Sequence, residues 1–240
     1  MSQSDENYRY DSLSQLKFEL RLRKEIVNTA RELNGSEFSF SGFHSSKCNP
    51  EYWEKTDNGG FRLNNGANPS EALNDIFTNG SEYATECATA MIIIYYKALL
   101  NIFGEGLFNE SFPNIYLMNW HSIDPLLKEV GSPKEEKDIL LGDRGYFVNP
   151  DVDPKTPQWQ GENVIVLPGG MYYGHGIGIK TAQEMINALN DNRKKDATQP
   201  AYLRDLVSRP DFNKLEGVYH RAAAQTVFLV WSAFPPAIKA

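Results

Sequence analysis

The chain has 240 residues, of which 41% are hydrophobic and 23% are charged, so a single domain of this length can bury a sizeable core without disulfides or metal ions. Its net charge of −7 and the lack of a basic stripe argue against a nucleic-acid partner.

The start, MSQSDENYRYDS, is polar and acidic, so we expect no secretory signal and synthesis in the cytoplasm. The longest apolar run, residues 88–103, contains Lys97 and Asn101 and falls short of the roughly 20 apolar residues of a membrane span. A soluble protein that needs no membrane is therefore expected. Two cysteines, Cys48 and Cys87, are too few for a disulfide framework and are expected to be free thiols.

A long helix is predicted near the N-terminus. Ser12 can cap it, Gln15 follows three residues later, and Gly35 is a natural stop. Its apolar residues recur near the helical period, at Leu13, Leu16, Leu20, Val27, Ala30 and Leu33. Residues 36–69, which hold the turn signals DNGG and NNGANP, predict a loop-rich region.

A short helix is predicted from Pro69 to Asn79-Gly80, followed by a helix that is apolar nearly all round and so belongs in the interior. Ser81 or Thr85 can cap this second helix. Strands are expected at 114–120, 145–148, 163–167 and 171–179, a charged surface loop at 132–138, and an amphipathic helix at 182–193.

The segment AAAQTVFLVWSAFPPAIKA at the C-terminus can be a strand, a docking tail or a poorly ordered end. Without a repeat or a linker, we predict one α+β domain over residues 1–240, with 1–10 and 222–240 as poorly ordered tails.

Cys87 stands at the start of the apolar helix, directly after Glu86. Free cysteines are mostly buried and inert, so an unreactive core thiol is one interpretation. The other is a nucleophile, because the positive end of a helix favours the thiolate. Glu86 acts against the thiolate unless it serves as a base, so position alone leaves both interpretations open.

A thiol nucleophile needs a base and an orienting group. Among four histidines, His175 lies between glycines in YYGHGIGI, where another segment can approach the backbone closely. A structural role for His175 is equally compatible with this pattern.

Glu162 precedes the predicted hairpin around Pro168-Gly169-Gly170. A two-residue connection places Glu162 directly opposite His175, with Cβ atoms about 4.5–5.5 Å apart. A three-residue connection centred on Gly169 places them on opposite faces of the sheet. We favour the first register, and a solvated carboxylate at a strand end remains the alternative.

Other constellations are weaker. His44 and Cys48 have zinc-ligand spacing, but no second ligand pair follows them. The stretch Asp151-Val-Asp153 begins like a calcium loop and then lacks its Gly and terminal Glu. No phosphate-binding glycine motif occurs in the sequence. We therefore expect no metal and no cofactor.

Three motifs, ECATAMIIIYYKALL, GDRGYFVNPDVDPKTPQWQGENVI and YYGHGIGI, together resemble the protein-glutamine gamma-glutamyltransferases of spore-forming bacteria, the small spore-coat transglutaminases. The resemblance extends from about Tyr10 to Leu203. It implies a papain-like α+β fold in which a central helix carries the Cys nucleophile and packs on an antiparallel sheet.

The resemblance also implies roles for residues. The nucleophile falls on Cys87, the catalytic Glu on Glu162, a partly redundant Glu on Glu86, and the site His on His175.

Substrate-binding aromatic residues of the family match Trp120, Trp159 and Phe38. Family members are calcium-independent and work in the spore coat. The chain differs from the family pattern at both ends and at residues 132–137.

The implied reaction joins a protein-bound Gln to a Lys of another protein through a Cys thioester, giving an isopeptide cross-link. We expect protein substrates bearing Gln and Lys, and a monomeric enzyme. Two alternatives remain: a papain-like thiol peptidase or amidase, and a catalytically inactive coat scaffold protein.

Overall fold

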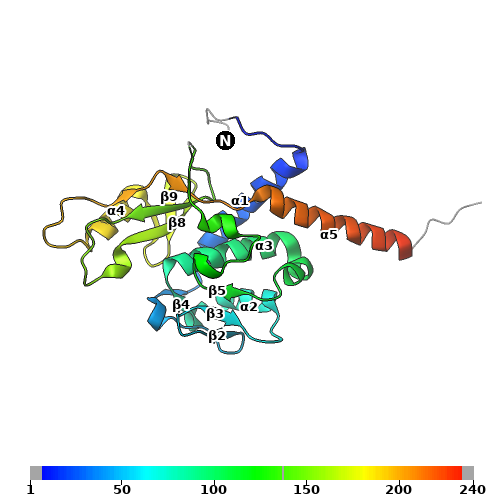
Figure 1. Ribbon diagram of the computed structural model, residues 1–240, viewed down its shortest axis with the longest axis horizontal. Coiled ribbons are helices and arrows are strands. Elements are labelled where there is room, and N and C mark those ends of the chain that lie inside the picture. Colours follow the sequence, from blue (N-terminus) through cyan, green and yellow to red (C-terminus); the bar gives the residue numbers. More distant parts are fainter. Residues whose placement is uncertain (1–6, 137, 234–240) are drawn as a thin grey trace, which may run out of the picture.

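Helix α3 (Cys87–Ser111) runs through the centre of the molecule in the computed structural model, which describes residues 7–136 and 138–233 (Figure 1). From Ala88 to Leu100 every residue except the half-buried Lys97 is buried, as the sequence predicted for an apolar helix without a polar face. The helix is long and apolar enough to cross a membrane, yet 78% of its most apolar stretch is buried inside this protein. Burial in the protein core accounts for its composition.

Helix α1 (Leu13–Asn34) packs beside α3 and has the predicted ends. The Ser12 hydroxyl accepts a hydrogen bond from the Gln15 backbone N–H, and Gly35 follows the last helical residue. The predicted apolar face was partly wrong, because Leu13 and Leu20 are 64% and 47% exposed. The buried face instead continues through Phe18, Leu22 and Ile26.

An antiparallel sheet of five strands lies against these two helices, in the order β10-β9-β8-β7-β11 (Figure 1). The strands are β7 (Arg144–Val148), β8 (Gly161–Leu167), β9 (Met171–Gly174), β10 (Gly178–Thr181) and β11 (Tyr202–Leu203). The strands predicted at 145–148 and 163–167 are confirmed within a few residues. The strand predicted at 171–179 is in fact two, because the chain turns at Gly176, where φ is +105°.

The connection between β8 and β9 fixes which side chains share a face. Leu167 pairs with Met171, so the connection has three residues, and the favoured two-residue register was wrong. In the observed register Glu162 and His175 belong to opposite faces. Ile165 and Leu167 pack in the core around α3, and the Asn163 side chain lies on the same face of β8 as they do.

Strand β8 is buried on both faces, which explains its unbroken apolar run. Ile165 and Leu167 join the main core around α1 and α3. Val164 joins a second cluster with Phe147, against which helix α4 (Ala182–Asn190) packs.

Short elements complete the fold. Helix α2 (Pro69–Thr78) is confirmed, with Asn68 as its cap. The remaining strands are short: β1 (Ser39–Phe40), β2 (Trp53–Lys55), β3 (Phe61–Leu63), β4 (Ala84–Thr85), β5 (Tyr116–Leu117), β6 (Lys134–Glu135) and β12 (Leu206–Val207).

These short strands correct two predictions. The strand expected at 114–120 is only β5, and the expected surface loop at 132–138 contains β6, which pairs with β12.

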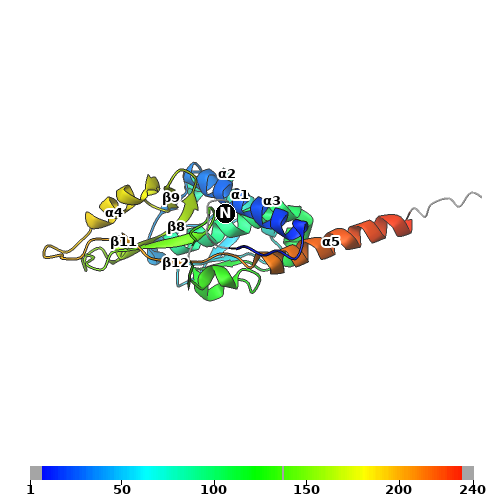
Figure 2. The same cartoon turned by 90° about the horizontal axis from the view of Figure 1, so that it is seen from above.

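Helix α5 (Phe212–Ala233) begins in the main core, where Phe212 and Leu215 are buried, and its later turns extend away from the rest of the molecule, as Figure 2 shows. The backbone from 222 to 233 is helical, so the strand alternative for this segment was wrong; residues 234–240 lie outside the described part of the chain. Near the other end, the Tyr8 hydroxyl donates to Asp138 at 2.6 Å and the Tyr10 hydroxyl to Glu19 at 3.1 Å. This part of the predicted N-terminal tail is thus bound to the body, while residues 1–6 lie outside the description.

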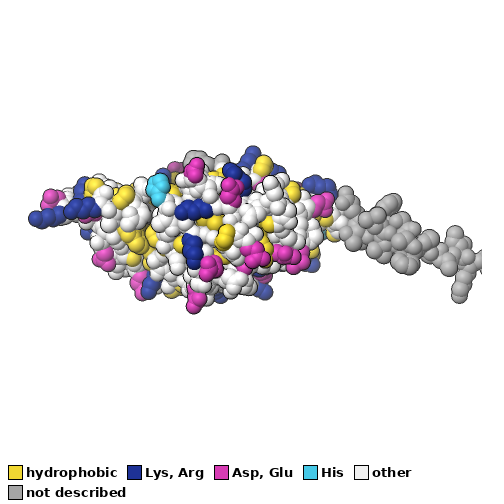
Figure 3. Space-filling model, turned by 90° about the horizontal axis from the view of Figure 1, so that it is seen from below, with side chains coloured by type: hydrophobic (Ala, Val, Ile, Leu, Met, Phe, Trp, Pro, Cys, Tyr) yellow, Lys and Arg dark blue, Asp and Glu magenta, His cyan; other side chains and the backbone are white. Residues whose placement is uncertain are grey.

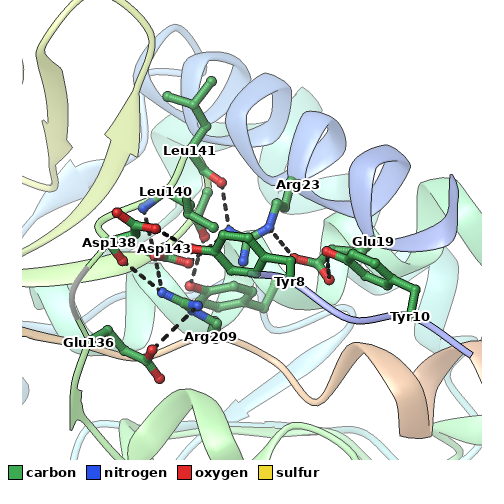
Figure 4. A network of polar contacts seen from close by, with 12 residues as sticks. Tyr8, Tyr10, Glu19, Arg23, Glu136, Asp138, Leu140, Leu141, Asp143 and Arg209 are labelled. Atoms are coloured by element: carbon green, nitrogen blue, oxygen red, sulfur yellow. Dashed lines mark hydrogen bonds and ion pairs between the residues drawn. The ribbon is translucent and has the colours of Figure 1, made fainter. Parts of the chain in front are cut away.

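A buried polar network ties α1 to the segments before β7 and α5 (Figure 4). Asp143 is fully buried and accepts hydrogen bonds from Arg23 at 2.7 Å, from Arg209 at 2.8 Å and from the Leu140 backbone N–H at 2.9 Å. Arg23 also donates to Glu19 at 2.7 Å. These charged groups are removed from water together, so the loss of any one of them leaves its partners without the opposite charge that stabilises them.

We expect Asp143→Asn to lower the free energy of unfolding by about 3–5 kcal/mol, because it leaves two guanidinium groups without their shared carboxylate. Urea unfolding followed by circular dichroism measures this loss. Asp196→Asn, at an exposed position, is the control and should change stability by less than about 0.5 kcal/mol. Superimposable curves for Asp143→Asn and the wild type would show that the network adds nothing.

Candidate active site

Cys87 is the first residue of α3, and Glu86 caps the helix. The Glu86 carboxylate accepts hydrogen bonds from the backbone N–H of Ala88 at 2.5 Å and of Thr89 at 2.7 Å, and from the Thr89 hydroxyl. The predicted caps, Ser81 and Thr85, were wrong. Glu86 rather than the thiol takes the free N–H groups of the first turn, so the helix end does not favour the thiolate as the sequence suggested.

A cleft of about 510 Å³ opens onto Cys87. Its walls come from the segments around β1, the start of α3, the turn after β5, and strands β7 and β8. The lining residues are Phe40, Gly42, Phe43, Glu86, Cys87, Ala88, Asn119, Trp120, Tyr146, Pro157, Gln158, Gln160, Gly161 and Asn163. A half-buried thiol at the wall of a cleft of this size can meet a side chain of another protein.

Asn163 is the side chain that bonds the thiol. Its Nδ2 donates to the Cys87 Sγ at 3.3 Å, and its Oδ1 accepts from Arg144 at 2.7 Å. Neither Asn163 nor Arg144 was among the site residues predicted from the sequence. The signal was available in QGENVI, because alternation along a strand means that only one of Glu162 and Asn163 can face α3.

The thiol is uncharged at rest. Burial raises the pKa of Cys87 above its ordinary range, and the charges of Glu162 and Glu86 raise it further. The side-chain and backbone amides of Asn163 act in the opposite direction and lower this pKa. A base must therefore remove the thiol proton when the sulfur attacks.

Glu162 is only 1% exposed, and its Oε1 has no hydrogen-bond partner among the described residues. Burial, followed by the charge of Glu86, raises the pKa of Glu162 well above that of an ordinary glutamate, while the backbone N–H of His175 lowers it. The structure shows no hydrogen bond between the described Glu162 and Cys87 side chains. The two groups interact through charge, and Oε1 is the atom free to accept a proton.

The absence of a side chain at Gly174 leaves room for the Glu162 side chain. A Cβ at this position would lie 2.7 Å from Glu162 Cγ and 3.0 Å from Oε1. At Gly176 a Cβ would lie 2.8 Å from the Phe40 ring. The glycines around His175 thus allow close approach, as the sequence indicated, and the groups that approach them are Glu162 and Phe40.

His175 is buried behind the cleft. Its Nε2 lies 3.1 Å from the Ser39 carbonyl oxygen and its Nδ1 lies 3.1 Å from the Tyr173 hydroxyl. Burial lowers the pKa of His175 to about 4, so the ring is neutral near pH 7. Since a carbonyl only accepts, Nε2 carries the proton and Nδ1 accepts from Tyr173. Both nitrogens are occupied, and no hydrogen bond joins the described His175 and Cys87 side chains.

The predicted aromatic residues take different places. Trp120 lines the cleft, and its ring lies 4.1 Å from the Arg144 guanidinium. Trp159 stacks on Phe40 with ring centroids 5.8 Å apart. Phe38 is buried, 4.8 Å from the His175 ring, and Phe40 rather than Phe38 lines the cleft.

The weaker motifs have structural explanations. Cys48 is half-buried and donates to the Trp53 carbonyl at 3.6 Å, and burial raises its pKa to about 11. Asp151 pairs with Lys194 at 2.7 Å and accepts two backbone N–H bonds. Within residues 7–136 and 138–233, no group of three His, Cys, Asp or Glu side chains could hold a metal ion.

Comparison with known proteins identifies the family. The family model for protein-glutamine gamma-glutamyltransferase matches residues 1–219. The chain is 47% identical over 211 residues to the enzyme of that name from Bacillus mycoides and 44% identical over 209 residues to the one from Halalkalibacterium halodurans. These matches cover 88% and 87% of this chain, and 75% and 72% of the relatives.

A solved structure gives the same result for the fold. The transglutaminase from Geobacillus stearothermophilus, without its C-terminal extension, superimposes with a TM-score of 0.82 at 44% identity. The match covers 87% of this chain and 98% of that one, so the mixed α+β fold is shared. The chain therefore belongs to the protein-glutamine gamma-glutamyltransferase family, and it is an acyltransferase whose substrates are proteins that carry Gln and Lys side chains.

Proposed function

We propose that the chain forms isopeptide cross-links in two steps at Cys87. The sulfur attacks the γ-carboxamide carbon of a protein-bound Gln, the C–N bond breaks, and ammonia leaves with the proton that the thiol gave up. The product is a γ-glutamyl thioester. A Lys ε-amine then attacks this carbon, the C–S bond breaks, and the amine proton passes through the base to restore the thiol.

The observation that carries this mechanism is the juxtaposition of the thiol, the Asn163 amide and two carboxylates. Asn163 donates to Sγ, and the charges of Glu162 and Glu86 act on the thiol. Glu162 is the better base, because its Oε1 is free whereas both oxygens of Glu86 accept bonds from the helix. Proton transfer to Oε1 requires a bridging water or a side-chain rotation, since the resting structure has no direct bond there.

The aromatic rings at the cleft favour a Lys amine over water in the second step. Phe40, Trp120 and Tyr146 line it, and Trp159 supports Phe40 from behind. Apolar walls exclude the water that would otherwise hydrolyse the thioester. The arrangement of a nucleophile at the start of a buried helix packed on an antiparallel sheet is, in our proposal, papain-like.

We further propose a place of action in the spore coat, and a monomeric enzyme made in the cytoplasm. The family resemblance supports the first. Lys/Arg and Asp/Glu side chains lie interspersed on the face in Figure 3, a mixed surface suited to varied protein substrates.

The decisive experiment is incorporation of a fluorescent primary amine into a Gln-bearing protein, with and without a chelator. We expect covalent labelling at an equal rate in both samples. Release of ammonia without amine incorporation would identify a thiol amidase, and an unreactive Cys87 would identify a scaffold protein. A rate that falls with chelator and returns on calcium titration would contradict the metal-free mechanism.

Gly174→Ala tests the space around Glu162. We expect amine incorporation to fall about 10²-fold, because a methyl group 2.7 Å from Glu162 Cγ displaces the carboxylate. Gly106→Ala is the control, since a Cβ there meets nothing within 4 Å and Ala is the better helix residue. Initial rates and melting temperatures are measured for both variants. An active Gly174→Ala enzyme would show that the position of Glu162 does not matter.

A further inference from the structure

Arg144 is a buried cation without an acidic partner. It is 6% exposed, and among the described residues no carboxylate lies within ion-pair distance of its guanidinium. Its donors go to neutral oxygens: the Val130 carbonyl at 3.0 Å, Asn163 Oδ1 at 2.7 Å and Ser208 Oγ at 2.6 Å. Burying a charge in this way is costly, so a role at the adjacent thiol would explain it.

The guanidinium decides how the Asn163 amide is oriented. A guanidinium only donates, so the atom that faces Arg144 must be the oxygen of the amide. The NH₂ end is then left for the Cys87 sulfur, where it lies at 3.3 Å. Turned by 180°, the amide would present its oxygen to the sulfur and accept the thiol proton, which favours the neutral thiol.

We propose that Arg144 is a positioning residue that holds the Asn163 amide with its NH₂ group toward the Cys87 sulfur, so that Asn163 stabilises the thiolate at the moment of attack. Asn163 touches the reacting atom and is the catalytic residue of the pair. The proposal deepens the thiol mechanism proposed above and rests on it.

The surroundings fit this role. Arg144 Cζ lies over the Trp120 ring, 4.1 Å from its centroid, so the aromatic face stabilises the cation while one of its nitrogens bonds Asn163. The Val130 and Ser208 contacts fix the far side of the group. The Arg–Asn pair therefore has one orientation, and it lies on the face of β7 and β8 that meets α3.

The test is the pH dependence of Cys87 alkylation by iodoacetamide. It is measured in a Cys48→Ala background, so that Cys87 is the one thiol that can be alkylated. Glu86, Glu162 and Tyr146 are the other ionisable groups near this thiol, and they are the same in all samples. We expect Arg144→Gln to move the alkylation midpoint up by about one pH unit or more and to lower the rate of amine incorporation about 10²-fold. The surface arginine Arg62, which likewise lies over an aromatic ring (that of Tyr116), gives the control Arg62→Gln, for which we expect an unchanged midpoint.

A double-mutant cycle separates positioning from charge. In an Asn163→Ala background, Arg144→Gln should move the midpoint by less than half of its effect in the parent. An equal shift in both backgrounds would show that Arg144 acts by charge alone, and no shift in a folded Arg144→Gln protein would show a scaffolding role; either result overturns the proposal. If Arg144→Gln does not fold, the same cycle is run with Arg144→Lys. Alkylation needs no Gln or Lys substrate. If the parent enzyme had no transferase activity, the proposed function would be overturned, but the alkylation cycle would still test the role of Arg144.

Discussion

Replacing Cys87 by Ala should abolish amine incorporation, whereas Cys48→Ala should leave it near the wild-type rate. Cys87 lies in the cleft, bonded to Asn163 and influenced by two carboxylates. Cys48 is half-buried away from these groups and bonds only a backbone carbonyl among the described contacts. Without a sulfur at position 87 no thioester can form, so the loss should reach the background of the assay.

The measurement is the initial rate of amine incorporation for both variants, with mass spectrometry after reaction of the wild type with a Gln donor alone. A donor adduct should appear on the peptide that contains Cys87 and be absent from Cys87→Ala. Activity that survives in Cys87→Ala and disappears in a folded Cys48→Ala protein would reverse the assignment. Cys87→Ser, with its weaker nucleophile, checks that the loss reflects chemistry and not packing.

Glu162→Gln should lower the rate by about 10²–10⁴-fold, the usual contribution of a general base. Glu86→Gln should cost less, since the Glu86 oxygens are committed to capping α3. Each carboxylate acts on the same thiol, so the double substitution should lose more than the product of the two single losses. Initial rates of the four proteins at one pH measure this coupling. Two losses that simply multiply would contradict a shared role.

The pH dependence gives a second test of Glu162. Its pKa is raised in the folded protein, so the folded state holds this proton more tightly than the unfolded chain does. The stabilising contribution of the protonated acid is complete below about pH 4.3 and is lost as the pH rises through the folded pKa. Glu162→Gln cannot ionise and should therefore melt higher than the wild type at pH 8, with the difference shrinking toward pH 4. A variant that melts lower at pH 8 would show that the ionised carboxylate is stabilised in the fold.

His175→Ala should lower the stability of the fold, whereas the two glutamate variants should lose activity because a proton acceptor is missing. The neutral ring bonds Ser39 and Tyr173, so its loss disturbs the packing between β1 and β9 and removes no base. If His175→Ala alone matched the double glutamate variant with its fold intact, the base would be His175.

Local chemistry in the sequence predicted the helices and pointed to Cys87 as the candidate nucleophile. Ser12 and Gly35 fix the ends of α1 because capping depends on residues within one turn. Apolar residues on every side of the helix that begins at Cys87 predicted that it is buried. Three motifs in a fixed order indicated the family and the position of Cys87. The wrong cap shows the limit of this reasoning, since a carboxylate one residue before the helix satisfied the free N–H groups better than Ser81 or Thr85 could.

Only the tertiary structure decided what surrounds the thiol. A change of one residue in the β8–β9 connection reverses which β9 side chains share a face with a given β8 side chain, and the sequence offered no stronger reason for three connecting residues than for two. That one residue puts the His175 ring and the Glu162 carboxylate on opposite faces of the sheet. The packing of β8 on α3 puts Asn163 beside the sulfur, where Arg144 on the neighbouring strand bonds its amide oxygen. Distances between residues 87, 144 and 163 are set by strand pairing and packing over long stretches of chain, and no local propensity encodes them.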